Sequence, residues 1–216
     1  MKKILLFASI AFVVASCSHK PKFELEVNIQ NNHSLIDKKA VIVQKKEGVI
    51  TFSDTIKIRK DKFVLEIPYD GPALIDVSIP GSNVRDVMMA AEEGKIQLNI
   101  DGAKPQIGGS PLNDRLQAFY RGNDSVNLLF QQLDKDFQTL SQGGKTTPQQ
   151  QSEYDQKRSQ LLKENTNRII AFTKENVDNP VGEYYFMTTY ITFPIDRRLE
   201  LNAFATPKLK QAFGIK

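Results

Sequence analysis

The hydrophobic pattern changes its period once along the chain, at Gly108-Gly109. Before this point, in runs such as 23–29, apolar residues alternate with polar ones, which places one face of a strand on a core and the other in water. After it, apolar residues recur at steps of three and four, which indicates helices. We therefore expect an α+β fold in which the strands precede the helices.

The first part of the chain contains about seven candidate strands, separated by turn residues such as Asp70-Gly71-Pro72. Short strands at this spacing are typical of an antiparallel β-sandwich or a partly open barrel. We expect a β-sandwich domain over residues 23–109. Its candidate strands are 23–29, 40–44, 49–58, 63–67, 73–79, 84–91 and 96–100.

The second part, residues 110–216, is predicted to be a helical domain. Apolar residues in heptad positions, with Asn123 among them, run from Leu112 to Leu140 and predict one long helix, with a local kink at Gly122. A second apolar face follows a short loop and completes a long antiparallel helical hairpin. Short terminal helices near 180–192, 194–203 and 207–213 should fold back on it and bury Tyr184, Tyr185, Met187, Tyr190, Ile191, Leu199 and Phe213.

Four of these helices begin with the same signal, a capping side chain followed by a proline at the first helical position. Gln150, three residues after Thr147, adds a capping box at one of them. The four starts are Ser110-Pro111, Thr147-Pro148, Asn179-Pro180 and Thr206-Pro207.

The N-terminus has the pattern of a bacterial lipoprotein signal. Lys2 and Lys3 precede an apolar stretch, Ile4–Ala15, that is too short to span a bilayer, which needs roughly 20 residues, but suits a secretory signal. The stretch ends in Val14-Ala15-Ser16-Cys17, an aliphatic residue and two small ones before a cysteine, as in a lipobox. We expect residues 1–16 to be removed as a signal peptide.

Cys17 is then the predicted lipid attachment site, anchored in the membrane by acyl chains such as palmitate. Residues 17–22 form the lipidated tether. The tether carries no acidic run, which favours a cell-envelope protein on the outer membrane, facing the periplasm.

Cys17 is also the only cysteine, and the chain has only two histidines. This composition excludes an intramolecular disulfide, a Cys-x-x-Cys pair and a cysteine-rich zinc site. We expect no metal and no other cofactor. Lys2 and Lys3 supply half of the formal net charge of +4, so the mature chain lacks the basic excess of a nucleic-acid-binding protein.

The order of these features resembles the N-terminal domain of unknown function of Bacteroidetes lipoproteins. The resemblance rests on the lipobox, the sandwich, the segment 109–114 that opens the hairpin, and Asn179-Pro180 within 175–186. In larger members a thioredoxin-like or peroxiredoxin-like domain, a thiol-disulfide oxidoreductase, follows. The present chain ends at Lys216 with no cysteine after Cys17, so the resemblance implies no redox activity here, because thiol exchange requires a thiolate.

Other polar clusters favour structural interpretations. Solvated positions are expected for His33, Glu92-Glu93, and Asp134 with Asp136, since paired carboxylates act as acid and base only when the fold sets their environment. The densest basic cluster is typical of a charged strand edge, with a contact to anionic lipid headgroups as the alternative. That cluster is Lys57, Arg59, Lys60 and Lys62.

The densest aromatic cluster contains Tyr184, Tyr185 and Tyr190. Core packing is the first expectation, and exposed tyrosines would instead form a sugar- or peptide-binding patch. Our leading hypothesis is a non-catalytic, membrane-anchored envelope lipoprotein that acts as a binding or interaction module, with a separate thioredoxin-like protein as one candidate partner. The alternatives are an enzyme whose site is assembled only in three dimensions, and a small-ligand or glycan-binding lipoprotein that uses the tyrosine cluster.

Overall fold

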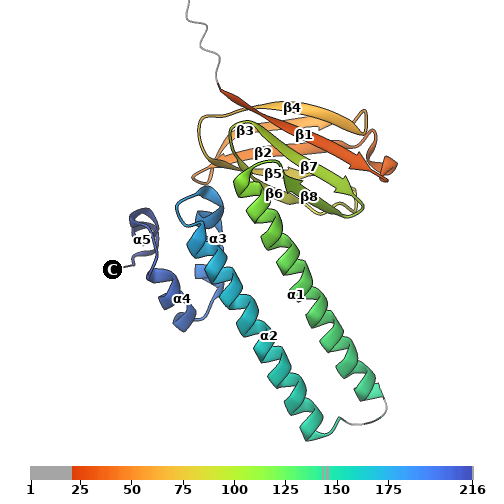
Figure 1. Cartoon of the computed structure of the whole chain (residues 1–216), viewed down its shortest axis with the longest axis vertical. Helices are drawn as coiled ribbons and strands as arrows, with labels where there is room; N and C mark the ends of the chain where they lie inside the picture. Colours follow the sequence, from red (N-terminus) through yellow and green to blue (C-terminus); the bar gives the residue numbers. More distant parts are fainter. Residues whose placement is uncertain (1–20, 143, 145, 216) are drawn as a thin grey trace, which may run out of the picture.

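The computed structural model describes residues 21–142, 144 and 146–215. Two four-stranded sheets stack into a β-sandwich, and helices follow it along the chain (Figure 1). The predicted α+β fold class, a sandwich followed by a helical hairpin and short terminal helices, is confirmed. The predicted signal peptide and Cys17 lie outside the described residues.

The strands alternate between the two sheets along the chain. The first sheet has the order β4-β1-β7-β8 and the second has the order β3-β2-β5-β6. A short 3₁₀ helix, His33–Leu35, joins β1 to β2. The bounds are β1 Lys22–Gln30, β2 Lys39–Lys46, β3 Val49–Lys57, β4 Lys62–Pro68, β5 Ala73–Ser78, β6 Val87–Ala91, β7 Lys95–Asp101 and β8 Lys104–Gly108.

Two details differ from the predicted antiparallel sandwich of about seven strands. β1 pairs with β7 in parallel, with Leu25 opposite Ile96, while its other neighbour, β4, is antiparallel. An eighth strand, β8, follows β7 after a tight turn and pairs with it. The alternation of side chains fixes which face is buried but not the direction of a neighbour, so the parallel pair could not be predicted from it.

The core lies between the two sheets and continues into the helices. Alternate residues of β1, Phe23, Leu25 and Val27, are buried with their counterparts on β5 and β7. The same hydrophobic cluster includes side chains from three helices, namely Leu112, Leu116, Phe119, Phe172 and Val181. The predicted division into domains at residue 109 stays a prediction, and the described core extends across it.

Four of the described helices, α1, α2, α3 and α5, begin at the prolines that follow the predicted capping residues. α1 runs unbroken through Gly122, so the kink expected there does not interrupt the helix. None of the helices in the described ranges is long and apolar enough to cross a membrane. The bounds are α1 Pro111–Gln142, α2 Pro148–Glu175, α3 Pro180–Thr192, α4 Ile195–Asn202 and α5 Pro207–Phe213.

The hairpin of α1 and α2 projects away from the sandwich (Figure 1). Among the described residues of these two helices, none between Tyr120 and Ile169 is buried. The prediction that the terminal helices bury their apolar residues was partly wrong, because α3 and α4 pack on one side only. Their other sides leave Tyr184, Met187, Ile191 and Leu199 exposed.

Candidate functional site

The first turns of α1 are bonded to the edges of both sheets. Asn113 accepts a hydrogen bond from Ala90 N and donates one to Ala90 O, each at 2.9 Å, on the edge strand β6. Gln117 accepts from Ile107 N at 2.7 Å on the edge strand β8. The hydroxyl of Tyr120 donates to Met88 O at 3.0 Å. These side chains lie on one face of the helix and fix it across the end of the sandwich.

The N-terminus of α1 is capped by a carboxylate from the sandwich rather than by Ser110. Glu92 accepts hydrogen bonds from Leu112 N at 3.1 Å and Asn113 N at 3.3 Å, and the Ser110 hydroxyl donates to the same carboxylate. The expected solvated position of Glu92 was therefore wrong. An anion at a helix N-terminus satisfies free N–H groups and interacts favourably with the helix dipole.

A cleft of about 370 Å³ lies where the sandwich, the hairpin and α3 meet. Residues 85–88, which lead into β6, and side chains of α1 line it. Asn165 of α2 and two tyrosines of α3 complete the lining. The lining residues that matter below are Arg85, Tyr120, Asn123, Asn165, Tyr184 and Tyr185.

Tyr185 of the cleft packs against two stacked phenylalanine rings. Phe119 and Phe172 stack with ring centroids 4.0 Å apart, and the ring of Tyr185 meets both edge-on at 5.0 and 5.4 Å. Burial raises the pKa of Tyr185 to about 12 and also raises the pKa of Tyr120. Both phenols are therefore neutral near pH 7, where they serve as hydrogen-bonding groups.

Arg168 of α2 connects α2 to α1 next to the cleft. Its Nη2 donates to the Oδ1 of Asn165 at 2.6 Å and also to the Oδ1 of Asn123, and its Nη1 donates to Phe119 O at 3.2 Å. The guanidinium lies over the Phe119 ring at 5.0 Å. Burial lowers the pKa of Arg168.

Two basic side chains pair with Asp124 in the lining of the cleft. The Asp124 carboxylate forms ion pairs with Arg85 Nη1 and Lys104 Nζ, each at 3.3 Å. The Arg85 guanidinium also lies 6.0 Å from the centre of the Tyr120 ring. No group of three or more His, Cys, Asp or Glu side chains that could hold a metal ion occurs within the described ranges.

The three tyrosines predicted as a patch do not lie together in one site. Tyr184, which is 42% exposed, and Tyr185 line the cleft. Tyr190 lies instead in a separate C-terminal cluster, stacked on Phe186 at 5.6 Å and close to Phe213 at 4.6 Å. The expectation of core packing thus holds for Tyr185 and Tyr190, each partly buried against a core cluster, but not for the exposed Tyr184.

The remaining residues of the cleft were missed in the sequence. Asn123 and Gly122 carried a readable signal, because a polar residue and a glycine interrupt an otherwise apolar heptad stripe. A Cβ at Gly122 would lie 2.7 Å from Arg168 Nη1, so the glycine leaves room for this guanidinium. Arg168, Asn165 and Arg85 had no such signal, since each is an ordinary surface residue type in its own segment.

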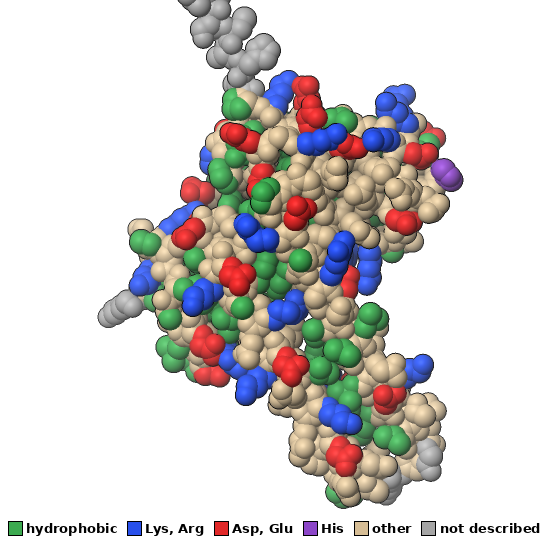
Figure 2. All heavy atoms as spheres, viewed as in Figure 1, with side chains coloured by type: hydrophobic (Ala, Val, Ile, Leu, Met, Phe, Trp, Pro, Cys, Tyr) green, Lys and Arg blue, Asp and Glu red, His purple; other side chains and the backbone are tan. Residues whose placement is uncertain are grey.

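The other polar candidates lie outside the cleft. The side chain of His33 is 83% exposed and lies 3.6 Å from Asp61, as expected for a solvated turn. In the basic cluster, Lys57 pairs with Asp37 and Lys62 with Glu26, each at 2.8 Å. Figure 2 shows acidic and basic side chains interspersed over the sandwich face in view, with no concentration of one sign.

The two predicted carboxylates of the hairpin form local contacts. Asp134 accepts from the hydroxyl of Tyr154 at 2.7 Å and lies 3.3 Å from Arg158. Asp136 accepts from Gln132 at 2.7 Å. Both contacts are exposed, so the expectation of a solvated helix face is confirmed.

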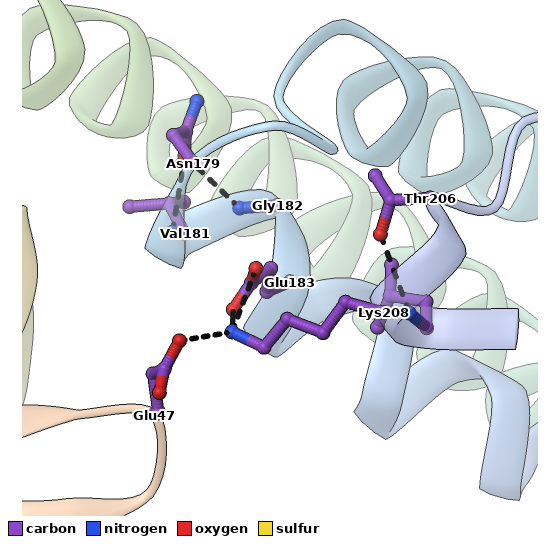
Figure 3. A network of polar contacts seen from close by, with 8 residues as sticks. Glu47, Asn179, Val181, Gly182, Glu183, Thr206 and Lys208 are labelled. Atoms are coloured by element: carbon purple, nitrogen blue, oxygen red, sulfur yellow. Dashed lines mark hydrogen bonds and ion pairs between the residues drawn. The ribbon is translucent and has the colours of Figure 1, made fainter. Parts of the chain in front are cut away.

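Lys208 joins the C-terminal helix to the rest of the fold (Figure 3). Its ammonium group donates to Glu183 of α3 at 2.9 Å and to Glu47 in the β2–β3 turn at 3.0 Å. These two carboxylates raise the pKa of Lys208, Glu183 having the larger effect. The same view shows Asn179 capping α3 through the backbone N–H groups of Val181 and Gly182.

Comparison with known proteins identifies two segments. Residues 23–116 match a family described as Domain of unknown function (DUF4369), and residues 1–18 match a prokaryotic membrane lipoprotein lipid attachment site. No curated protein matches this chain. The chain thus contains a segment that matches this domain after a match to a lipoprotein attachment site, and it is a lipid-anchored protein of the cell envelope.

Proposed function

We propose that this lipoprotein is a non-catalytic binding module and that the cleft between the sandwich, the hairpin and α3 is its binding site. One observation carries the proposal: aromatic and amide side chains from three helices converge, beside residues 85–88, on a cleft whose elements are joined by partly buried hydrogen bonds. A concave site with a few fixed polar groups is the usual form of a small-molecule site in proteins.

The tyrosines support binding rather than proton transfer. A phenol whose pKa is raised above its usual value keeps its proton near neutral pH and therefore donates a hydrogen bond without acting as a base.

Native mass spectrometry of the full-length lipoprotein tests this proposal. The protein is incubated with a small-molecule extract of the envelope, and we expect it to retain a bound compound of unchanged mass. The Tyr184→Ala variant, which alters the exposed wall of the cleft, should lose that compound, while Tyr154→Ala in the distal hairpin should keep it. A wild-type protein that retains nothing contradicts the proposal, and conversion of the compound to a new mass supports an enzyme instead.

We also propose where the lipid is attached and which membrane holds the protein. Cys17 carries the lipid, with palmitate among its acyl chains, and the protein faces the periplasm from the outer membrane. The match to a lipid attachment site over residues 1–18 and the tether without an acidic run support this placement. Cys17→Ser should abolish labelling by a clickable palmitate analogue and release the protein from membranes, and unchanged labelling contradicts it.

A second proposed function is the interaction with a separate thioredoxin-like protein of the envelope. The exposed apolar residues of the hairpin, Leu128, Leu129, Leu140 and Leu162, support it, because nothing in the described chain covers them. Cross-linking from positions 129 and 162 in intact cells should recover a thiol oxidoreductase. Cross-links that recover only other proteins contradict this partner.

A further inference from the structure

Arg168 fixes the orientation of two amide side chains at the cleft. A guanidinium can only donate hydrogen bonds, so the atoms that face it on Asn123 and Asn165 must be the carbonyl oxygens. Each Nδ2 group therefore lies on the side away from Arg168. Both asparagines line the cleft, and neither Nδ2 donates to another described residue. The cleft thus offers two oriented amide donors.

The position of Arg168 depends on Gly122. A methyl group at this position would lie 2.7 Å from Nη1 and force the guanidinium to move. Glycine within a helix is unfavourable by about 1 kcal/mol relative to alanine. The close approach of Arg168 gives a physical reason for a glycine in the middle of α1.

The charges around the cleft favour an uncharged ligand. Asp124 is already paired with Arg85 and Lys104, and Asp86 adds a second carboxylate to the lining. A carboxylate or phosphate ligand would meet these two acidic groups. A cationic ligand would meet Arg85, with Arg168 directly behind the wall. Hydrogen bonds between neutral partners avoid both penalties.

The backbone of β6 is closed to an extended peptide. Peptides commonly bind a sheet by adding a strand to a free edge. β6 is an edge strand, but its Ala90 N–H and carbonyl are bonded to Asn113 and its Met88 carbonyl to Tyr120. The cleft therefore lacks the free main-chain groups that such a peptide would need along this edge.

The remaining features match a carbohydrate. A sugar ring combines many hydroxyl acceptors with an apolar C–H face, and tyrosine rings offer flat apolar area beside a polar hydroxyl. Tyr184 and Tyr185 present such rings next to the two amides. The cleft volume of about 370 Å³ is near the lower end for ligand sites, which suits a short saccharide.

We propose that the cleft binds a short, uncharged saccharide, with the Nδ2 groups of Asn123 and Asn165 donating to its oxygens and Tyr184 contacting its ring. Arg168 is a positioning residue that holds both amides. This inference rests on the proposed function and names the ligand class of the same site.

Titration calorimetry of the full-length protein in detergent tests the inference. The probes are a panel of neutral di- and trisaccharides, the matching uronic-acid saccharides, and neutral tripeptides. The decisive variant is Asn165→Asp, which keeps an oxygen for Arg168 but removes the Nδ2 donor. Its matched control is Asn167→Asp, which adds the same charge two residues away on α2 at an exposed position outside the lining.

We expect at least one neutral saccharide to bind the wild type, with affinity about tenfold weaker or worse in Asn165→Asp and unchanged in Asn167→Asp. The thermal midpoint of Asn165→Asp should equal or exceed that of the wild type. If Asn165 had only a structural role, binding would be lost only together with a lower thermal midpoint. Unchanged saccharide affinity in Asn165→Asp overturns the inference.

The panel separates this inference from the proposed function. Binding of uronic-acid saccharides or tripeptides alone, lost in Tyr184→Ala, overturns the saccharide class while the cleft remains a binding site. Binding of no probe, together with no compound retained in the native mass spectrum, overturns both.

Discussion

Asn113 shows how one side chain can close the edge of a sheet. It is fully buried and satisfies both the N–H and the carbonyl of Ala90. A backbone group that loses its partner in a buried position costs about 1–3 kcal/mol. The stability of the junction therefore depends on polar contacts that the apolar stripe of α1 does not reveal.

Replacing Asn113 by alanine should lower the free energy of unfolding by about 2–4 kcal/mol, because two buried backbone groups lose their partners. Urea denaturation followed by circular dichroism measures this. Gln132→Ala is the control, since the Gln132 side chain donates to the exposed Asp136 on the same helix, and we expect a change within about 0.5 kcal/mol. Equal effects of the two variants would contradict this account of the junction.

Glu26 gives the fold a sensitivity to acid. Its carboxylate lies between Lys62 Nζ, at 2.8 Å, and Lys95 Nζ, and hydrogen bonds from these lysines lower its pKa from 4.5 to about 2. Because the folded-state pKa is lower than the unfolded one, this contribution is complete above about pH 4.5 and is lost as the pH falls toward 2.

The Glu26→Gln variant should therefore be less stable than the wild type at pH 6, and the difference should shrink steadily between pH 4.5 and 2. Urea midpoints at several pH values measure it. Glu24→Gln removes a charge from the same strand while leaving these two hydrogen bonds in place. If its difference from the wild type shrinks over the same range by the same amount, the explanation is wrong.

At the scale of elements, the connection between α2 and α3 is set by a close backbone contact. A Cβ on Gly182 would lie 1.8 Å from Asn176 O, a distance at which the backbone itself must move. Asn176 is buried and donates to Phe172 O at 2.8 Å, so the turn has little freedom to adjust. This contact determines how α3 reaches the cleft.

Gly182→Ala should destabilise the protein by about 3 kcal/mol or more, because the added methyl group overlaps backbone that cannot shift. Thermal unfolding measures the loss. Gly122→Ala is the comparison on α1, where the methyl group meets the end of the Arg168 side chain and the helix propensity of alanine, about 1 kcal/mol, partly offsets the displaced contacts, so we expect a smaller loss. A stable Gly182→Ala variant would show that the turn is more adaptable than its geometry indicates.

The elements were largely predictable because their signals are local. Asn179-Pro180 and Thr206-Pro207 place the first residues of α3 and α5, and both side chains cap as expected. Ser110-Pro111 has the same local signal, yet the cap comes from Glu92, which is distant in sequence. The cleft is harder still to predict, since Arg85, Asn123, Asn165 and Tyr185 meet only once the helices are packed against β6.

For the whole molecule, the helices complete the sandwich as well as extend from it. Leu112, Leu116 and Phe119 belong to the same core cluster as the strands, while the distal hairpin contributes no buried residue among those described. The matched domain, residues 23–116, likewise reaches into α1. The sandwich and the proximal hairpin should therefore unfold together.

A chain cut after Gly109 should fail to remain a folded monomer, because β6 and β8 lose the side chains that close their edges. Size-exclusion chromatography and circular dichroism test this. In the control, residues 130–158 are replaced by a short linker, which removes Phe137 together with its stacking partner Tyr154. The control should stay monomeric and folded, and a monomeric, folded sandwich after the first cut would contradict the prediction.

The central position of β1 in its sheet has a mechanical consequence. The described chain enters the sandwich through β1, which lies between β4 and β7 rather than at an edge. Tension applied from the N-terminal side along β1 would load the hydrogen bonds to both neighbours in shear at the same time, whereas an edge strand would be held by the hydrogen bonds to one neighbour alone. The lipid anchor therefore pulls on a strand that is held on both sides, and the fold should withstand drag on the membrane without yielding at its first strand.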